Sequence, residues 1–157
     1  MDKTVIITIG LPGCGKSTTV KQNFPNIAII ERDIIRKEMV DNFTWSTWDW
    51  SLEPEINNIF NLIVDIFINT ERTFICSDTN LRSDYRLKLA NKLKNNNYNV
   101  FYLIFATTPD VCLKRDKERL YSVGEEVIYK LYNRDKKFVN TAVNEAIIND
   151  YKWHIIE

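Results

Sequence analysis

The sequence predicts an α/β fold in which one parallel sheet of about four to five strands carries helices on both faces. Short apolar runs, typical of strands covered on both sides, alternate with longer segments whose apolar residues recur every three or four positions. A glycine-rich segment separates the first apolar run from the first helical segment. The chain of 157 residues has the usual size of one domain, so we expect a single domain over residues 1–157.

The first half of the chain contains two strand-and-helix pairs, followed by a long helix. Apolar runs predict the strands, and the three-four spacing of apolar residues predicts the helices. Asp33 and Pro54 suit the start of a helix. These elements are expected at residues 3–9 (strand), 16–23 (helix), 26–31 (strand), 33–40 (helix) and 54–70 (helix).

An aromatic segment lies between the last two of these helices. Trp45, Trp48 and Trp50 stand among Ser, Thr and Asp residues, with neither a helical nor a strand period. We expect a loop over residues 44–53. At least one of the tryptophans should pack in the core, whereas exposed ones would suit stacking on bases.

The second half of the chain continues the alternation. A helix over residues 83–96 is expected to turn Tyr85, Leu89 and Leu93 inward. The segment around Gly124 breaks the pattern, and a last strand near 153–156 is the weakest assignment. The other elements are expected at 73–77 (strand), 100–106 (strand), 109–119 (helix) and 127–139 (helix).

The glycine-rich segment, Gly-Leu-Pro-Gly-Cys-Gly-Lys-Ser, matches the phosphate-loop pattern and lies between a predicted strand and a predicted helix. Its glycines allow backbone N–H groups to face phosphate oxygens, Lys16 reaches the β- and γ-phosphates, and Ser17 is a ligand for Mg²⁺. We expect ATP with Mg²⁺, since the chain has no guanine-selecting Asn-Lys-x-Asp string. The predicted nucleotide contacts are Gly10, Pro12, Gly13, Cys14, Gly15, Lys16, Ser17 and Thr18.

Two further blocks carry side chains that suit phosphoryl transfer. Asp33 and Arg36 are three residues apart at a helix start, where a carboxylate can deprotonate an acceptor hydroxyl and a guanidinium can bind a phosphate. The alternative is a helix cap and a surface charge. Asp78, followed by Asn80, stands at the end of a predicted strand, where an acid commonly supports the metal, although a local turn would also explain it.

Arg115 and Arg119 lie four residues apart on one helical face, before an irregular segment. This arrangement suits a lid over about 114–126 that brings positive charge to the transferring phosphate. The alternative is a solvated basic face.

Taken together, these motifs resemble the kinase domain of phage polynucleotide kinase over about 140 residues. The resemblance implies that Asp33 is the general base on a 5′-hydroxyl, that Arg36 binds acceptor phosphate, and that Arg115 and Arg119 are lid arginines. It also implies site roles for Asp78 and Asn80. The expected reaction is transfer of the ATP γ-phosphate to the 5′-hydroxyl end of DNA or RNA. The alternatives are a kinase for a nucleoside or another small hydroxyl metabolite, and an ATP-binding switch protein that transfers no phosphate.

Composition limits the partners. The 21 basic and 21 acidic side chains cancel, so we expect the protein to hold only about two to four nucleotides at the strand end. Three scattered cysteines argue against a disulfide framework or a zinc site. The absence of an export signal and of a long apolar stretch predicts a cytoplasmic protein without membrane contact. The sequence indicates no oligomeric state.

Overall fold

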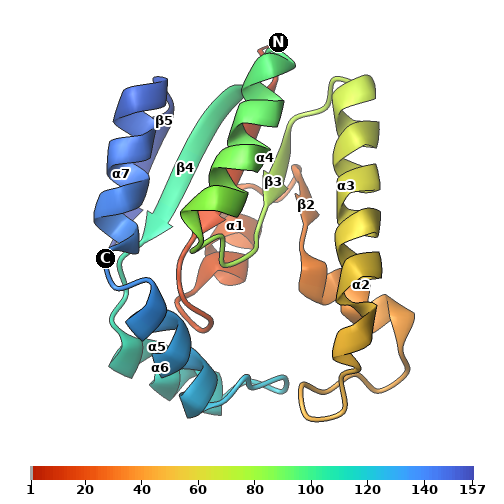
Figure 1. Cartoon of the computed structure of the whole chain (residues 1–157), viewed down its shortest axis with the longest axis vertical. Coiled ribbons are helices and arrows are strands. Elements are labelled where there is room, and N and C mark those ends of the chain that lie inside the picture. The colour runs from red at the N-terminus through yellow and green to blue at the C-terminus, as the bar shows by residue number, and fades with distance from the viewer. Residues whose placement is uncertain (1) are drawn as a thin grey trace.

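Five parallel strands form one sheet, in the order β2-β3-β1-β4-β5, in the computed structural model, which describes residues 2–157 (Figure 1). β1 lies at the centre, and its Val5 is in register with Phe74 on one side and Val100 on the other. The strands are β1 (Thr4–Ile9), β2 (Ala28–Ile30), β3 (Phe74–Cys76), β4 (Asn99–Phe105) and β5 (Lys152–Ile156). The predicted parallel α/β sheet is therefore confirmed.

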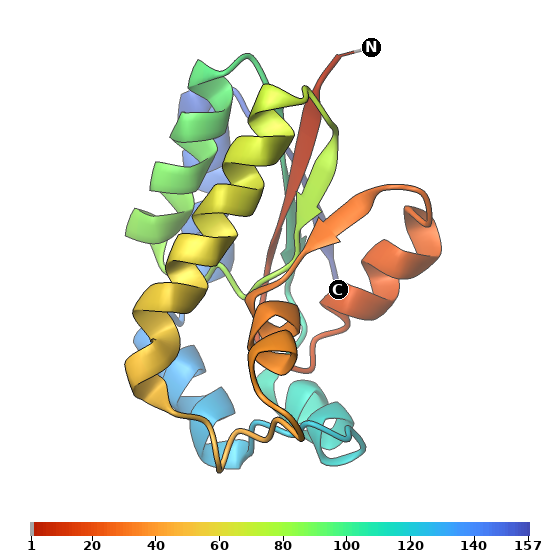
Figure 2. The same ribbon diagram turned by 90° about the vertical axis from the view of Figure 1, so that its right-hand side faces the viewer.

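Helices cover both faces of this sheet. α3, α4 and α7 lie on one face and α1 on the other, as the two views show (Figures 1 and 2). A short 3₁₀ helix, η1 (Trp50–Leu52), precedes α3. The helices are α1 (Lys16–Asn23), α2 (Arg32–Met39), α3 (Glu53–Asn69), α4 (Ser83–Asn95), α5 (Pro109–Lys117), α6 (Glu125–Arg134) and α7 (Phe138–Asn149).

The sequence-based boundaries were wrong in the last third of the chain. The helix expected over 127–139 is two helices, α6 and α7, because the chain turns at residues 135–137 and places Phe138 in the core. α7 then occupies part of the tail that had no assignment, and β5 pairs with β4 as the expected last strand. β2 and β3 are also shorter than expected, with three residues each.

The face of α4 that turns inward carries a buried ion pair between Arg86 and Glu145. Arg86 is fully buried and binds Glu145 of α7, with Nε 2.7 Å from Oε2. Its Nη1 also donates to the carbonyl oxygens of Asn80 and Leu81. Tyr85, which the apolar pattern placed inward, is instead 65% exposed. The pair fixes the loop after β3, and every polar group of the buried guanidinium finds a partner, as burial of a charge requires.

The loops at the carboxyl ends of β1, β2 and β3 meet at one edge of the sheet, which is where α/β folds bind their ligands. A cleft of about 1890 Å³ opens there between these loops, α3, α4 and the segment that joins α5 to α6. No helix within residues 2–157 is both long enough and apolar enough to cross a membrane.

Candidate active site

The phosphate loop has the tight curl that its glycines predict. Gly13 and Gly15 have φ values of +79° and +102°, which favour glycine. A Cβ at Gly10 would lie 2.7 Å from Cys14 Sγ, and one at Gly13 would lie 2.5 Å from the Cys112 carbonyl oxygen. Glycine is therefore the residue that fits at each of these three positions.

Lys16 and the start of α1 supply the donors of this loop. The Lys16 ammonium donates to the carbonyl oxygens of Gly10 and Leu11, at 3.0 and 2.7 Å, so it lies inside the curl. Thr19 is the first residue of α1 whose N–H bonds back along the helix, to Gly15. The N–H groups before it have no acceptor within the helix, which makes this helix end suited to an anion. Of the other predicted nucleotide contacts, Pro12 and Thr18 line the cleft, and Cys14 is buried beside Lys16.

Ser17 has a partner that the sequence analysis missed. Its hydroxyl donates to Glu31 Oε1 at 2.9 Å. Glu31 directly follows β2 and is the N-cap residue of α2, whereas Ser17 belongs to the helix after β1, so the pair forms across the end of β3, which lies between these two strands. The signal was present in the acidic residue at the end of the second apolar run, two residues before Asp33.

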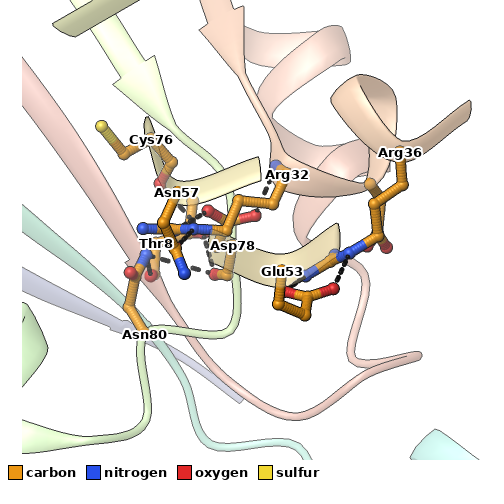
Figure 3. Close-up of polar contacts among 9 residues, drawn as sticks. Thr8, Arg32, Arg36, Glu53, Asn57, Cys76, Asp78 and Asn80 are labelled. Carbon is orange, nitrogen blue, oxygen red and sulfur yellow. Dashed lines mark hydrogen bonds and ion pairs between the residues drawn. The ribbon is translucent and has the colours of Figure 1, made fainter. Parts of the chain in front are cut away.

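Asp78 is held by Arg32, another residue that the sequence analysis missed (Figure 3). The Arg32 backbone N–H donates to Asp78 Oδ1 at 2.9 Å, and its Nη1 lies 2.5 Å from Oδ2. Arg32 Nε also donates to Asn57 of α3. Burial raises the pKa of Asp78, and the charge of Arg32 opposes this shift. Both carboxylate oxygens of Asp78 therefore bind the first residue of α2.

Asp33 and Arg36 lie side by side on α2, as their spacing predicts. Arg36 Nη1 is 2.6 Å from Asp33 Oδ1. The N-cap of α2 is Glu31 rather than Asp33, and Arg36 is only 9% exposed. The alternative of a helix cap with a surface charge is thus wrong for both residues. Asp33 lines the cleft with part of its carboxylate exposed.

Glu53 completes this pair from the first residue of α3 (Figure 3). Arg36 Nε and Nη2 each lie 2.8 Å from a Glu53 oxygen, and Trp48 Nε1 donates to Glu53 Oε1 at 2.8 Å. Burial lowers the pKa of Arg36, but Glu53 and Asp33 more than offset it and raise that pKa. Arg36 in turn lowers the pKa of Glu53. The spacing of residues in the sequence could not predict that Glu53 binds Arg36, because the loop before α3 determines where Glu53 lies.

The Asn80 side chain connects the end of β1 to the loop after β3. Its Nδ2 donates to the Thr8 carbonyl oxygen at 2.8 Å and lies 3.3 Å from the Asp78 carbonyl oxygen (Figure 3). Its φ of +43° lies in the left-handed region, which Asn tolerates. The structure thus gives its amide group a backbone partner, and the predicted substrate contact of Asn80 remains a prediction.

The expected lid segment contains the end of α5, a turn and the start of α6. Arg115 Nη1 donates to the Cys14 carbonyl oxygen at 3.1 Å, which joins α5 to the phosphate loop. Arg119 lines the cleft, and its side chain is 40% exposed. The buried Asp116 orders the turn by accepting from Ser122 Oγ, the backbone N–H groups of residues 123 and 124, and Arg119 Nη1.

The tryptophans divide between core and cleft. Trp48 is buried, as expected for at least one of them. Trp45 lies with its ring 5.1 Å from the Arg36 guanidinium, and Trp50 stacks on Trp45 with ring centroids 5.8 Å apart. Trp50 is 64% exposed and, like Trp45, lines the cleft. An aromatic surface thus stands beside the Asp33 and Arg36 pair.

This fold and this cleft define a phosphate-loop domain of the kinase type, with a parallel sheet whose central strand leads into the loop. Residues 5–137 match the family described as AAA domain (AAA_33), and the chain belongs to this family.

Known relatives agree with this placement. The chain is similar to an L-seryl-tRNA(Sec) kinase of Methanococcus maripaludis, with 29% identity over 138 residues, which are 83% of this chain and 51% of that protein. The chain thus spans about half the length of this curated relative.

Solved structures with low sequence identity establish the fold. A chain of the Pnkp1/Rnl/Hen1 RNA repair complex superposes with a TM-score of 0.73 at 18% identity, over 88% of this chain and 45% of that one. A gluconokinase from Sinorhizobium meliloti 1021 superposes with a TM-score of 0.53 at 16% identity, over 84% of this chain and 74% of that one.

Proposed function

We propose that this protein transfers the γ-phosphate of ATP to the 5′-hydroxyl end of a DNA or RNA strand. The observation that carries the proposal is the contact between Asp33 and Arg36, 2.6 Å apart on a cleft that they share with Lys16 and Ser17. A base and a phosphate-binding cation thus stand together on the acceptor side of a nucleotide site. Trp45 and Trp50 beside them favour an acceptor that contains a base.

The donor side fits ATP with Mg²⁺. Lys16 and the N–H groups at the start of α1 converge where the β- and γ-phosphates would bind. Ser17 and Glu31 offer the hard oxygen ligands that Mg²⁺ prefers, and we assign them to the ion. Asp78, whose oxygens both bind Arg32, instead fixes the start of α2. Mg²⁺ supplies neutralisation of the phosphate charge when it is bound.

Asp33 performs the acid–base step. Its carboxylate accepts the proton of the 5′-hydroxyl while that oxygen forms its bond to the γ-phosphorus and the bond to the β-phosphate oxygen breaks, which releases ADP. Arg119, from the ordered turn, and Arg115, beside the phosphate loop, neutralise the charge that develops on the transferred group. Arg36 holds Asp33 at the cleft and binds phosphate of the acceptor strand.

The relatives support a nucleic-acid acceptor. One is a kinase named for a seryl-tRNA, and another is part of an RNA repair complex. By its name, the first of these relatives is a kinase for an RNA that carries a seryl group.

A kinase for a small hydroxyl metabolite is the second candidate, and one observation favours it. Three of the five N–H donors of Arg36 already bind Glu53 and Asp33, and Arg36 is only 9% exposed, so a phosphate of the acceptor has to compete with these carboxylates for the guanidinium. An acceptor without a phosphate requires no such contact with Arg36, and one structural neighbour is a gluconokinase.

Transfer of labelled phosphate from γ-labelled ATP to a set of acceptors tests the proposal. The set contains a 5′-hydroxyl DNA strand, a 5′-hydroxyl RNA strand of the same sequence, a nucleoside, seryl-tRNA and gluconate. We expect label on the DNA or RNA strand with a kcat/KM at least about tenfold above that for the nucleoside, since strand phosphates add contacts. Labelling of the nucleoside or gluconate alone would favour the second candidate. A Lys16→Ala variant serves as the blank.

A further inference from the structure

The cleft is strongly basic although the whole chain is neutral. Its acidic residues are Glu31, Asp33 and Asp78, and each of them already binds a residue of the site. Its basic residues are Lys16, Lys21, Arg32, Arg36, Lys37, Arg82, Lys88, Lys92, Arg115, Arg119 and Arg134. Five of these cations are ion-paired with carboxylates outside the lining, namely Glu53, Asp65, Asp84, Asp116 and Asp135. The cleft still has more cations than carboxylates, which suits a polyanion.

Part of this basic surface lies away from the phosphate loop, in a groove between α3 and α4. Asn57 and Asn61 of α3 line one wall, and α4 supplies the other. The α4 wall consists of Arg82, Tyr85, Lys88, Leu89 and Lys92. The groove lining contains amide, ammonium and guanidinium donors, one exposed aromatic ring and no carboxylate.

Arg82, Tyr85 and Lys88 of the α4 wall provide two positive charges and one exposed aromatic ring. Tyr85 is an exposed aromatic residue, and the Arg82 guanidinium lies 4.5 Å from its ring centroid. Arg82 also binds Asp84, but both side chains are about half exposed, and exposed ion pairs are weak enough to exchange partners. Lys88 is exposed and forms no ion pair with any residue of the described chain.

We propose that this α3–α4 groove binds the acceptor strand downstream of its 5′ nucleotide, with Lys88 and Arg82 on phosphates and Tyr85 stacked on a base. The inference rests on the proposed function and adds a site to it. Positive side chains that follow a groove, together with an aromatic face, are the features by which proteins hold single strands without reading their sequence.

The length of the groove limits the number of nucleotides. Arg82 and Lys92 are ten residues apart, which on a helix corresponds to about 15 Å. At about 3.4 Å per stacked nucleotide this accommodates about four nucleotides. The ion pair of Lys92 with Asp65, at 2.6 Å, joins α4 to α3 at the far end. Affinity is therefore expected to rise up to about five nucleotides in total and then to level off.

Fluorescence anisotropy with 5′-hydroxyl oligothymidylates labelled at the 3′ end, two to twelve nucleotides long, tests the groove without requiring transfer. We expect Tyr85→Ala to bind the five-nucleotide strand about 5- to 100-fold more weakly than the wild type, and Tyr85→Phe to restore most of the affinity. Lys88→Gln should reduce the slope of log affinity against log salt by about 0.7. Lys130→Gln, an exposed lysine of α6 outside the groove, is the matched control. Melting temperatures verify that each variant is folded.

The possible results distinguish a failure of the proposed groove from a failure of the proposed function. Equal affinities and equal length dependence in the wild type, Tyr85→Ala and Lys88→Gln would overturn the groove, even if the strand is phosphorylated. Absence of single-strand binding by the wild type would overturn it as well. Single-strand binding that is weakened by Tyr85→Ala, without any phosphorylation of the strand, would support the groove and overturn the proposed function alone.

Discussion

Arg36 links the part of the cleft around Asp33 to the start of α3 and to the loop before it. It reaches Asp33 within α2 and Glu53 at the start of α3, and Glu53 also binds Trp48 of the intervening loop. A guanidinium presents its donors in one rigid plane, so this set of contacts fixes its orientation. The position of Asp33 at the cleft is thus set by two helices and the loop between them.

Replacement of Asp33 with Asn tests the base directly. The amide keeps the size of the side chain but accepts no proton, so we expect turnover to fall by roughly 10² to 10⁴. ATP affinity, measured by calorimetry, should remain nearly unchanged because Asp33 does not contact the phosphate loop in the structure. Wild-type turnover in this variant would remove Asp33 from the mechanism.

Glu53 should contribute stability at neutral pH that is lost in acid. Arg36 holds the pKa of Glu53 below its ordinary value of 4.5, with burial acting against this. A carboxyl group whose pKa falls on folding stabilises the native state above its unfolded-state pKa, and the contribution disappears as the pH drops through the folded-state value.

Glu53→Gln should therefore be less stable than the wild type at pH 7, by about 1 to 2 kcal/mol since the side chain is partly exposed. The difference should shrink below about pH 4.5. Urea unfolding from pH 7 to pH 3 measures it, with Glu55→Gln on the exposed side of the same helix turn as the control. A difference that is independent of pH would contradict the electrostatic role of Glu53.

At the scale of elements, the turn between α5 and α6 is ordered by a single buried carboxylate. Asp116 accepts hydrogen bonds from Ser122 and from two backbone N–H groups, and it also contacts Arg119. The Arg119 contact is the longest of these, at 3.4 Å, and its side chain is partly exposed. Arg119 is therefore anchored at the cleft but remains able to reach a phosphate.

Replacement of Arg119 with Ala should reduce turnover by about 10² to 10³ and leave the melting temperature within a few degrees of the wild type. A contact made with the transferring phosphate matters for the rate, whereas an exposed arginine contributes little to stability. Lys114→Ala, on the exposed surface of α5 and outside the cleft, is the control. A lowered melting temperature with normal turnover would show that Arg119 serves the fold instead.

The pattern of elements was largely predictable because it depends on local sequence. Apolar runs indicated the strands, and the glycines of the phosphate loop occupy positions where their backbone angles and close contacts leave no space for a Cβ. The division into α6 and α7 was missed, because Phe138 enters the core from a turn of charged residues that carries no glycine or proline.

The site was predictable only where its residues lie close together in the sequence. Asp33 and Arg36 were found from their spacing, but Ser17 and Glu31 are 14 residues apart and Arg32 and Asp78 are 46 apart. The order of the strands in the sheet brings these pairs together, and the spacing of residues along the sequence does not predict that order. The role of Glu53 depends in the same way on a loop without a period.

At the scale of the whole molecule, the net charge does not describe the charge of the cleft. The equal numbers of basic and acidic side chains suggested a small contact with nucleic acid, yet the cleft gathers the basic ones and excludes most of the acidic ones. Composition gives only the sum of the charges, whereas the binding of a polyanion depends on where the charges lie on the surface. The expected footprint of about two to four nucleotides stays a prediction, and the groove that we propose between α3 and α4 would extend it to about five.

Phosphorylation of the 5′ end of a strand is the reaction that we propose for this cleft. The most direct test compares two DNA strands of the same sequence, one with a 5′-hydroxyl and one with a 5′-phosphate, incubated with γ-labelled ATP and Mg²⁺. We expect the label on the 5′-hydroxyl strand only, at its terminal nucleotide, and a loss of at least about 10² in rate for the Asp33→Asn variant. Equal labelling of both strands, or labelling that survives in Asp33→Asn, would contradict a 5′-hydroxyl kinase with Asp33 as its base.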